Sequence, residues 1–468
     1  MFCGVDFGTT NSSVAVSNGE RVRILEIDPA NDNPTLLPSL LYIARNGERI
    51  VGRAAADVYI ERNVNREIEL KQVDLGISIE SYVAAEPDKS RDYRPAETDD
   101  DAPREAVRAR AMIDPNEPGR LFQSLKSSLR HRTFHGTEAF GEHYQVEELT
   151  AMILRRAKEA ADAVAGKPVD TAVFGRPVRF SEDAEEDAVA ERRLRVAAQI
   201  AGFKDVVFFY EPVAACVEYA IGAERRQRLM VVDIGGGTCD VCVMEFGGAH
   251  GPAARLAESR ILGVAGVPVA GDAIDKEIIR AKLFPCFGSR SRYGPSMLPL
   301  PQFLFNTIAD WQNLYRLNTE ENINWLIASE MSSDQPRAVR ALRCLIRNNY
   351  GYPVAREVEL AKKRLSTQLE TDIEIRHKDI QIGERLERAE FAHIIEHMLE
   401  RMLASIEEAE KTAQTQPQEI DYVLTTGGTC LIPAVREMLD ARYGSARLLQ
   451  RETFTSVATG LAIVARYV

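Results

Sequence analysis

Two glycine-rich turns carry the residues whose types and spacing favour phosphate chemistry. Each turn follows an aspartate at the end of an expected strand and offers backbone N–H groups and threonine hydroxyls. Glycine permits the positive φ of a tight turn and lets an anion approach the backbone closely. The residues are Asp6, Gly8, Thr9 and Thr10 in the first turn, and Asp233, Gly235, Gly236, Gly237 and Thr238 in the second.

The two aspartates suggest a metal ion. A carboxylate that faces a polyphosphate is favourable when Mg²⁺ lies between them, and this ion usually keeps several of its waters. Asp6 and Asp233 are therefore expected to hold magnesium through water. The alternative is an ordinary hairpin with an acidic turn residue, which a matched pair of motifs makes less favourable.

The two segments match over their whole length. Placing Asp6 on Asp233, an offset of 227 residues (from 6 to 233), also places Val14 on Val241 without a gap. Solenoid repeats are far shorter, so this spacing predicts two related lobes that each present a hairpin. Neither GxxxxGK[ST] nor a GxGxxG turn after a strand occurs, which excludes the P-loop and dinucleotide-binding motifs.

Composition narrows the class of protein. The 468 residues are 45% hydrophobic and 27% charged, and 58 basic against 70 acidic residues give a net charge of −12. An acidic surface repels phosphates, so we expect neither nucleic acid nor a membrane as partner. No apolar run is long enough to span a bilayer, and the first residues do not read as a secretory signal. The 7 scattered cysteines favour a reducing cytoplasm.

Strands alternate with amphipathic helices, which indicates an α/β fold. We assign residues 1–222 plus 448–468 to the first lobe and 223–447 to the second. Two insertions interrupt the alternation. Residues 81–118 are charged and contain five prolines, which predicts a mobile insertion, and 284–352 hold both tryptophans and predict a helical subdomain. These insertions are the expected surfaces for a protein partner.

Five segments of the chain stand out together. They are GVDFGTTNSSVAV, RPVRF, the run from IAGFKDVVFFYEPVAACVEYA to VVDIGGGTCDVCVM, REVELAKKRLS and VLTTGGTCLIP. In this order they resemble the ATPase domain of DnaK-type heat-shock chaperones, in particular the YegD-like subgroup, within the actin/hexokinase superfamily. The likeness covers roughly residues 1–60, 120–280 and 354–468.

The resemblance implies a two-lobed actin-like fold with a central nucleotide cleft, which binds ATP or ADP with Mg²⁺. It implies slow hydrolysis of ATP coupled to lobe closure. The sequence ends at Val468, so we expect no peptide-binding domain after the ATPase fold. Two other functions stay open: a small-molecule kinase of the same superfamily, and a non-catalytic nucleotide-sensing or actin-like assembly module.

The resemblance also assigns roles to residues outside the two turns. Lys126 resembles the lysine that steers the γ-phosphate, with an exposed helix lysine as the alternative, and Glu211 resembles the acid that orders the attacking water. Further residues resemble a second-lobe anion loop, the nucleoside-binding helix and the adenosine loop. They are Gly271 and Asp272 in the anion loop, Glu359, Lys362, Lys363 and Ser366 on the helix, and Gly427, Gly428 and Thr429 in the adenosine loop.

The chain departs from the family at the nucleoside end. Lys363 and Leu431 stand where the family has arginines that flank the base, with Arg364 next to Lys363. The acid near the family's potassium site falls at Phe454 or Thr455. The second-lobe anion loop also differs, with alanines at 270 and 273. These departures put base selectivity and potassium dependence in doubt, but not the phosphate site.

Two further patterns resemble metal or redox motifs. His393, Glu396 and His397 match the HxxEH pattern of zinc proteases, but they lie in a charged amphipathic segment outside the expected cleft. We interpret them as a solvated helix face. Cys239 and Cys242 form CxxC, but positions i and i+3 of a strand point to opposite faces, so small buried residues are the better interpretation.

Overall fold

The first lobe is built on a six-stranded sheet. This computed structural model describes residues 1–66, 68, 71–82, 104–222, 225–246, 254, 258–450 and 455–467. The sheet has the order β13-β12-β1-β2-β3, with β4 paired to β2, and β1 runs parallel to β12 and antiparallel to β2. Its strands are β1 (Phe2–Phe7), β2 (Asn11–Ser17), β3 (Val22–Ile24), β4 (Leu37–Pro38), β12 (Thr171–Arg176) and β13 (Asp205–Tyr210).

The second lobe repeats this plan in a five-stranded sheet of order β16-β15-β14-β21-β22. Its strands are β14 (Gln227–Ile234), β15 (Cys239–Phe246), β16 (Arg260–Val267), β21 (Tyr422–Thr426) and β22 (Leu448–Gln450). In the two hairpins Asp6 pairs with Ser13 and Asp233 with Asp240, so the strand registers keep the offset seen in the sequence. The predicted duplication is confirmed.

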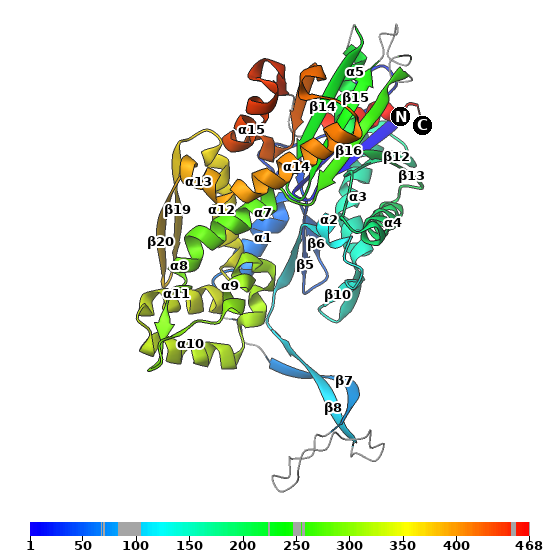
Figure 1. Ribbon diagram of the computed structural model, residues 1–468. Helices are drawn as coiled ribbons and strands as arrows, with labels where there is room; N and C mark the ends of the chain where they lie inside the picture. The colour runs from blue at the N-terminus through cyan, green and yellow to red at the C-terminus, as the bar shows by residue number, and fades with distance from the viewer. Residues whose placement is uncertain are drawn as a thin grey trace, which may run out of the picture.

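Helices cover the sheets and bury the apolar central strands on both faces (Figure 1). The helices associated with the two sheets are α3 (Val146–Ala165), α4 (Ala184–Ala201) and α5 (Glu211–Gly222), then α14 (Glu396–Thr412), α15 (Pro433–Tyr443) and α16 (Ser456–Val464). Helix α4 starts at an N-cap, Asp183, whose carboxylate accepts two backbone N–H groups, and stops at Gly202 in the left-handed region. The two-lobed α/β fold is the actin-like architecture that we expected.

Helix α16 returns from the second sheet to the first. A Cβ on Gly460 would lie 1.8 Å from the carbonyl oxygen of Ala214 in α5, so glycine allows the two helices to touch. A Cβ on Gly4 of β1 would meet the α16 backbone in the same way. Strand β22, however, pairs with β21, so the first-lobe segment assigned to 448–468 is wrong for Leu448–Gln450.

Smaller elements complete the wall of the first lobe. A three-stranded sheet of order β6-β5-β9 and the hairpin β10-β11 flank the first large sheet. The strands are β5 (Leu40–Ala44), β6 (Arg49–Val51), β9 (Gly119–Gln123), β10 (Gly136–Ala139) and β11 (Glu142–Gln145). Two helices belong to the same wall: α1 (Arg53–Asn63) and α2 (Leu125–Ser128).

Helices dominate the wall of the second lobe, including residues 284–352 where the sequence predicts a helical insertion. The helices are α7 (Gly271–Ile278), η1 (Ile279–Leu283), α8 (Phe284–Cys286), α9 (Gln302–Ala309), η2 (Trp311–Leu317), α10 (Glu320–Ser332), α11 (Pro336–Arg347), α12 (Gly351–Leu365) and α13 (Arg388–Ile394), with short turns η3 (Pro417–Glu419), η4 (Gly428–Leu431) and η5 (Ser445–Arg447). The strands are β17 (Arg292–Tyr293), β18 (Leu298–Pro299), β19 (Glu370–His377) and β20 (Ile380–Glu387).

A two-stranded antiparallel ribbon projects from the body between the two lobes (Figure 1). It consists of β7 (Lys71–Tyr82) and β8 (Arg104–Ile113). The sequence predicts a mobile insertion over 81–118. Within that range residues 104–113 form β8, whose backbone pairs with β7, while residues 83–103 lie outside the described part of the chain. In the described residues no helix is both long and apolar enough to cross a membrane.

Candidate functional site

One cleft of about 1880 Å³ lies between the lobes, and both glycine turns line it. The structure brings every residue that the sequence singles out for nucleotide or metal binding to this cleft. These residues are Asp6, Gly8, Thr9, Thr10, Lys126, Glu211, Asp233, Gly235, Gly236, Gly237, Thr238, Gly271, Asp272, Glu359, Lys362, Lys363, Ser366, Gly427, Gly428 and Thr429.

The two turns face each other across the cleft. A Cβ built on Gly236 would lie 2.0 Å from Thr10 Oγ1, and one on Gly237 would lie 2.6 Å from Thr9 Oγ1. No side chain fits at such separations, so glycine is required for the turns to approach. The threonine hydroxyls of one lobe therefore stand against the bare backbone of the other, which is a suitable cradle for phosphate oxygens.

A buried ion pair lies at the floor of the cleft. Lys126 Nζ donates to Glu211 Oε1 at 2.7 Å, and the side chains are only 6% and 8% exposed. Lys126 is held by the short helix α2, which follows Ser124 in the left-handed region, and Glu211 is the first residue of α5. The alternative of an exposed helix lysine is therefore excluded. Burial alone would lower the pKa of Lys126, but Glu211 and Asp6 raise it, so the ammonium stays charged.

Aspartates surround this pair. Burial raises the pKa of Asp6 to about 7, with a further rise from Glu211 that Lys126 partly opposes. Burial and Glu211 likewise raise the pKa of Asp233 well above its ordinary value. Negative charge is therefore in excess here, and Lys126 offsets only part of it. Hard cations such as Mg²⁺ prefer oxygen ligands, and carboxylates of this kind suit an ion held through its waters rather than by a full set of side chains.

Asp240 is a member of the same acidic group that the sequence analysis missed. It lies opposite Asp233 in the hairpin, is 1% exposed, and accepts the backbone N–H of Val178 at 2.6 Å. Burial and Glu211 raise its pKa to about 7. The available signal was an aspartate flanked by apolar residues in its strand, because a buried carboxylate requires a partner.

The start of α7 is joined to the second turn. The N–H groups of Gly271 and Asp272 donate to the carbonyl oxygens of Gly235 and Gly236, at 3.2 and 2.8 Å. Ser124 Oγ donates to Asp272 Oδ2 at 3.3 Å, so this carboxylate connects the lobes. Burial raises the pKa of Asp272 to about 6, against the opposing effect of Lys362.

Helix α12 and the loop after β21, where the resemblance places the nucleoside, line another part of the cleft. Lys362 Nζ donates to the Gly271 carbonyl oxygen at 3.0 Å and to Asp275 Oδ2 at 2.7 Å, so its ammonium braces the start of α7. Thr429 Oγ1 donates to the Gly235 carbonyl oxygen at 2.7 Å. Gly427 has φ +81°, and a Cβ there would lie 2.2 Å from the Ile234 carbonyl oxygen. This loop therefore packs directly on the strand that carries Asp233.

The basic residues of α12 diverge. Lys363 pairs with Glu359 at 2.7 Å and lines the cleft. Arg364 turns away from the cleft, because its guanidinium donates to Thr371 Oγ1 and Glu357 Oε1, each at 2.7 Å. Arg364 therefore does not place a planar guanidinium in the cleft beside Lys363.

The two patterns that resemble metal or redox motifs hold no visible site. His393 lies near the end of α13, whereas His397 lies in the next helix, α14. The ion pair between His393 Nδ1 and Glu396 Oε2, at 3.2 Å, is exposed to solvent. Among the described residues no group of three or more His, Cys, Asp and Glu side chains is placed to hold a metal ion directly. Cys239 and Cys242 are both buried free thiols. Of the two positions matched to the potassium site, Thr455 is buried and Phe454 lies outside the described residues.

Comparison with known proteins agrees with this geometry. The family model described as "Hsp70 protein" matches residues 2–112, 120–251 and 352–467. Chaperone protein DnaK 1 of Synechococcus sp. is 27% identical over 99% of this chain and 49% of its own length. Chaperone protein DnaK of Thermus thermophilus is 25% identical over 99% of this chain and 60% of its own length, so the chain spans about half the length of these relatives. With a matched family model over most of its length, the chain belongs to the Hsp70 family.

Proposed function

We propose that this protein binds ATP with Mg²⁺ and hydrolyses it slowly to ADP and phosphate, with closure of the lobes around the nucleotide. The observation that carries the proposal is the Lys126–Glu211 pair, buried at 2.7 Å beside two facing glycine turns. Phosphoryl transfer needs positioned charge more than covalent chemistry from the protein. A fixed ammonium among backbone amides, hydroxyls and carboxylates meets that need.

Each part of the cleft has its own task in this proposal. The turns at Gly8–Thr10 and Gly235–Thr238 bind the phosphates, and Lys126 faces the γ-phosphate. Asp6 and Asp233 would hold the magnesium through water; when bound, the ion neutralises charge on the phosphate oxygens. Glu211, fixed by Lys126, orients the attacking water.

The nucleoside lies on α12 and the loop after β21. Lys362 keeps the start of α7 in place, and the Glu359–Lys363 pair lines the wall of this part of the cleft. Because Lys363 and Leu431 replace planar cations, the base end is bound less firmly than the phosphate end. Base selectivity is accordingly weaker than phosphate selectivity.

Membership of this family supports a chaperone-related role. We propose that the protein carries out this role in the cytoplasm. Relatives named as DnaK chaperones extend well beyond the length that this chain matches. We propose a protein partner that contacts the ribbon β7–β8 or the helices of 284–352, because both project from the nucleotide-binding body (Figure 1).

The test is ATP turnover by purified protein, with ADP and free phosphate measured in parallel. Equal amounts of ADP and phosphate, without an added acceptor, are expected for a hydrolase. ADP without free phosphate in the presence of a small-molecule acceptor would instead establish a kinase. ATP-dependent light scattering without turnover would establish an assembling module.

A further inference from the structure

The ribbon β7–β8 is a two-stranded sheet with no third strand among the described residues. It projects away from the nucleotide-binding body, whose sheets it does not join (Figure 1). Two strands alone are marginally stable in water, and a third strand or a packed layer normally supports them. The outer edges of β7 and β8 leave backbone N–H and C=O groups open to another chain. The ribbon therefore offers two edges to which a partner strand could be added.

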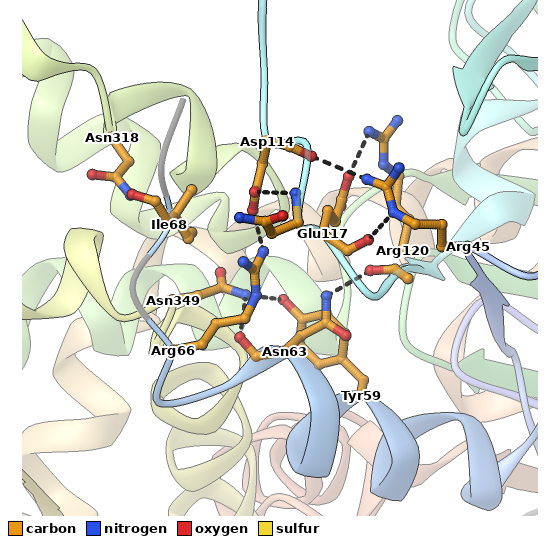
Figure 2. Close-up of polar contacts among 12 residues, drawn as sticks. Arg45, Tyr59, Asn63, Arg66, Ile68, Asp114, Glu117, Arg120, Asn318 and Asn349 are labelled. Carbon is orange, nitrogen blue, oxygen red and sulfur yellow. Dashed lines mark hydrogen bonds and ion pairs between the residues drawn. The ribbon is translucent and has the colours of Figure 1, made fainter. Parts of the chain in front are cut away.

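Polar contacts at the root fix both chains of the ribbon to the body (Figure 2). The chain that enters β7 is bound to the second lobe, because Asn318 Nδ2 donates to the Ile68 carbonyl oxygen at 3.3 Å. The chain that leaves β8 is bound to the first lobe, because Arg45 Nη2 donates to the Asp114 carbonyl oxygen at 3.1 Å. An ion pair between Arg66 and Asp114 joins the two chains. An edge that is already fixed in this way loses little conformational freedom when a strand is added to it.

The two edges of the ribbon differ in regularity. The pairing shifts register after Asp74, because β7 takes four steps to its next paired residue (from 74 to 78) while β8 takes two (from 110 to 108). Such a bulge bends a strand, and natural proteins use bulges to prevent pairing at an exposed edge. Strand β8 has no extra residues at this point and contains neither glycine nor proline. The regular edge, along which another strand can pair without a break, is therefore that of β8.

Strand β8 divides basic and apolar residues between its two faces, since residues an even number of positions apart share a face. One face holds Arg104, Arg108 and Arg110, and the other holds Val107, Ala109, Ala111 and Ile113, with Glu105 near the start of the strand. Three arginines against one glutamate give β8 a charge of +2 (3 − 1) in a chain whose net charge is −12. Of these arginines only Arg110 lies opposite an acid in the register, Asp74. The edge of β8 therefore matches a strand with carboxylates on one face and apolar residues on the other.

We propose that the outer edge of β8 binds an extended acidic segment of another protein by strand addition. The main chain of that segment pairs with the N–H and C=O groups of β8 that face away from β7, which are those of every second residue. Carboxylates at alternate positions of the segment take register positions beside Arg104 and Arg108, and the apolar residues between them extend the face of Val107. This inference rests on the ribbon as the proposed partner surface and specifies the chemistry of the partner. It does not depend on ATP hydrolysis.

The test is the fluorescence anisotropy of a fluorescein-labelled peptide in which glutamate and valine alternate over about six residues, a common strand length. The full chain should bind this peptide. It should bind the same peptide with lysine in place of glutamate at least about tenfold more weakly, because like charges on neighbouring strands repel. A glutamate peptide with two adjacent prolines at its centre should also bind more weakly, since one of them must face β8 and proline cannot donate to the ladder. Equal binding of the three peptides, or no binding of the first, would overturn the proposal.

Charge reversal on β8 tests whether its arginines select the acidic segment. Arg104→Glu combined with Arg108→Glu should weaken binding of the glutamate peptide by about tenfold, because two attractions become repulsions. The matched control is Arg192→Glu combined with Arg436→Glu, which makes the same change of charge at exposed positions on α4 and α15. The control should keep peptide affinity within about twofold of wild type. Equal weakening by the two double variants would show that the peptide responds only to the total charge of the protein, and would overturn the proposal.

Hydrogen exchange locates the added strand without a substitution. The glutamate peptide should slow amide exchange more in residues 104–113 than in 71–82, because the new hydrogen bonds form along β8. Slowing in 71–82 that equals or exceeds that in 104–113 would overturn the choice of edge. Calorimetry with ADP on the same protein tests the proposed function separately. Normal ADP binding without peptide binding would overturn this inference alone, whereas peptide binding without ADP binding would overturn only the proposed function.

Discussion

Lys126 and Glu211, which are 85 residues apart in the chain, meet at 2.7 Å in a buried ion pair at the floor of the cleft. The ammonium also interacts with Asp6, Asp233 and Asp240, so one cation faces four carboxylates. Negative charge gathered in this cleft favours a bound cation, and this requirement supports the proposed magnesium ion.

The excess of acids predicts unequal effects of removing the two partners. Lys126→Met should lower the free energy of unfolding by about 3–5 kcal/mol, because it leaves the buried carboxylates uncompensated. Glu211→Gln should cost much less, since Lys126 keeps Asp6 and Asp240 nearby. Urea unfolding without nucleotide or metal measures both values. Equal destabilisation by the two substitutions would show that Lys126 stabilises Glu211 alone and not the neighbouring aspartates.

The close approach of the turns predicts the effect of one added methyl group. Gly236→Ala places a Cβ 2.0 Å from Thr10 Oγ1 and 3.0 Å from Asp272 Oδ1, and must push the lobes apart. Overpacking of about 1–3 kcal/mol corresponds to ADP binding weakened by about 5- to 150-fold. Gly383→Ala is the control, because a Cβ there meets nothing within 4 Å and lies on β20. Calorimetry that finds equal affinities would contradict this geometry.

Removal of magnesium should stop turnover. EDTA is expected to abolish hydrolysis, and excess Mg²⁺ should restore it. Asp233→Asn should raise the magnesium concentration needed for half-maximal rate, because it removes a charge that would hold the metal's waters. Glu374→Gln, an exposed position on β19, serves as the control. Full activity in EDTA would show that hydrolysis needs no magnesium, and an unchanged magnesium requirement in Asp233→Asn would place the metal elsewhere.

The proposed nucleoside end of the cleft should bind ADP more tightly when arginines stand at positions 363 and 431. Lys363→Arg combined with Leu431→Arg should strengthen ADP binding by up to about thirtyfold, because cation–π contact contributes about 0.5–2 kcal/mol. Arg364→Ala should leave ADP affinity unchanged, since that side chain is bound to Glu357 and Thr371 outside the cleft. Calorimetric titration with ADP measures all three proteins. A double variant that binds no more tightly than wild type would refute this description of the pocket.

The sequence contains enough to place the two hairpins and their acids. Strand–glycine–strand patterns repeat at one offset, and the pairing of Asp6 with Ser13 and of Asp233 with Asp240 follows it residue for residue. Strand periodicity could not identify Asp240, because both faces of β15 are buried and a period of two then carries no information.

Other features depend on contacts between distant segments. Arg364 follows Lys363 by one helical step, but its direction is fixed by Thr371 and Asp372 on β19. The charged composition of 81–118 predicts a mobile insertion but gives no sign of the strand at 104–113, whose backbone pairs with β7. Asn349 Nδ2 donates to Tyr59 Oη, 290 residues away, and nothing local in either segment indicates this contact.

The most direct test of the account is single-turnover hydrolysis of ATP by Lys126→Ala at saturating ATP. The expected result is a rate lower by about 10²–10³, with ADP affinity changed only a few-fold, because a charge aimed at the γ-phosphate acts mainly in the transition state. Lys158→Ala is the matched control, since Lys158 is also buried and pairs with Asp162 at 2.7 Å, on α3. A Lys126→Ala protein that hydrolyses ATP at the wild-type rate, or slows no more than Lys158→Ala, would contradict the central claim.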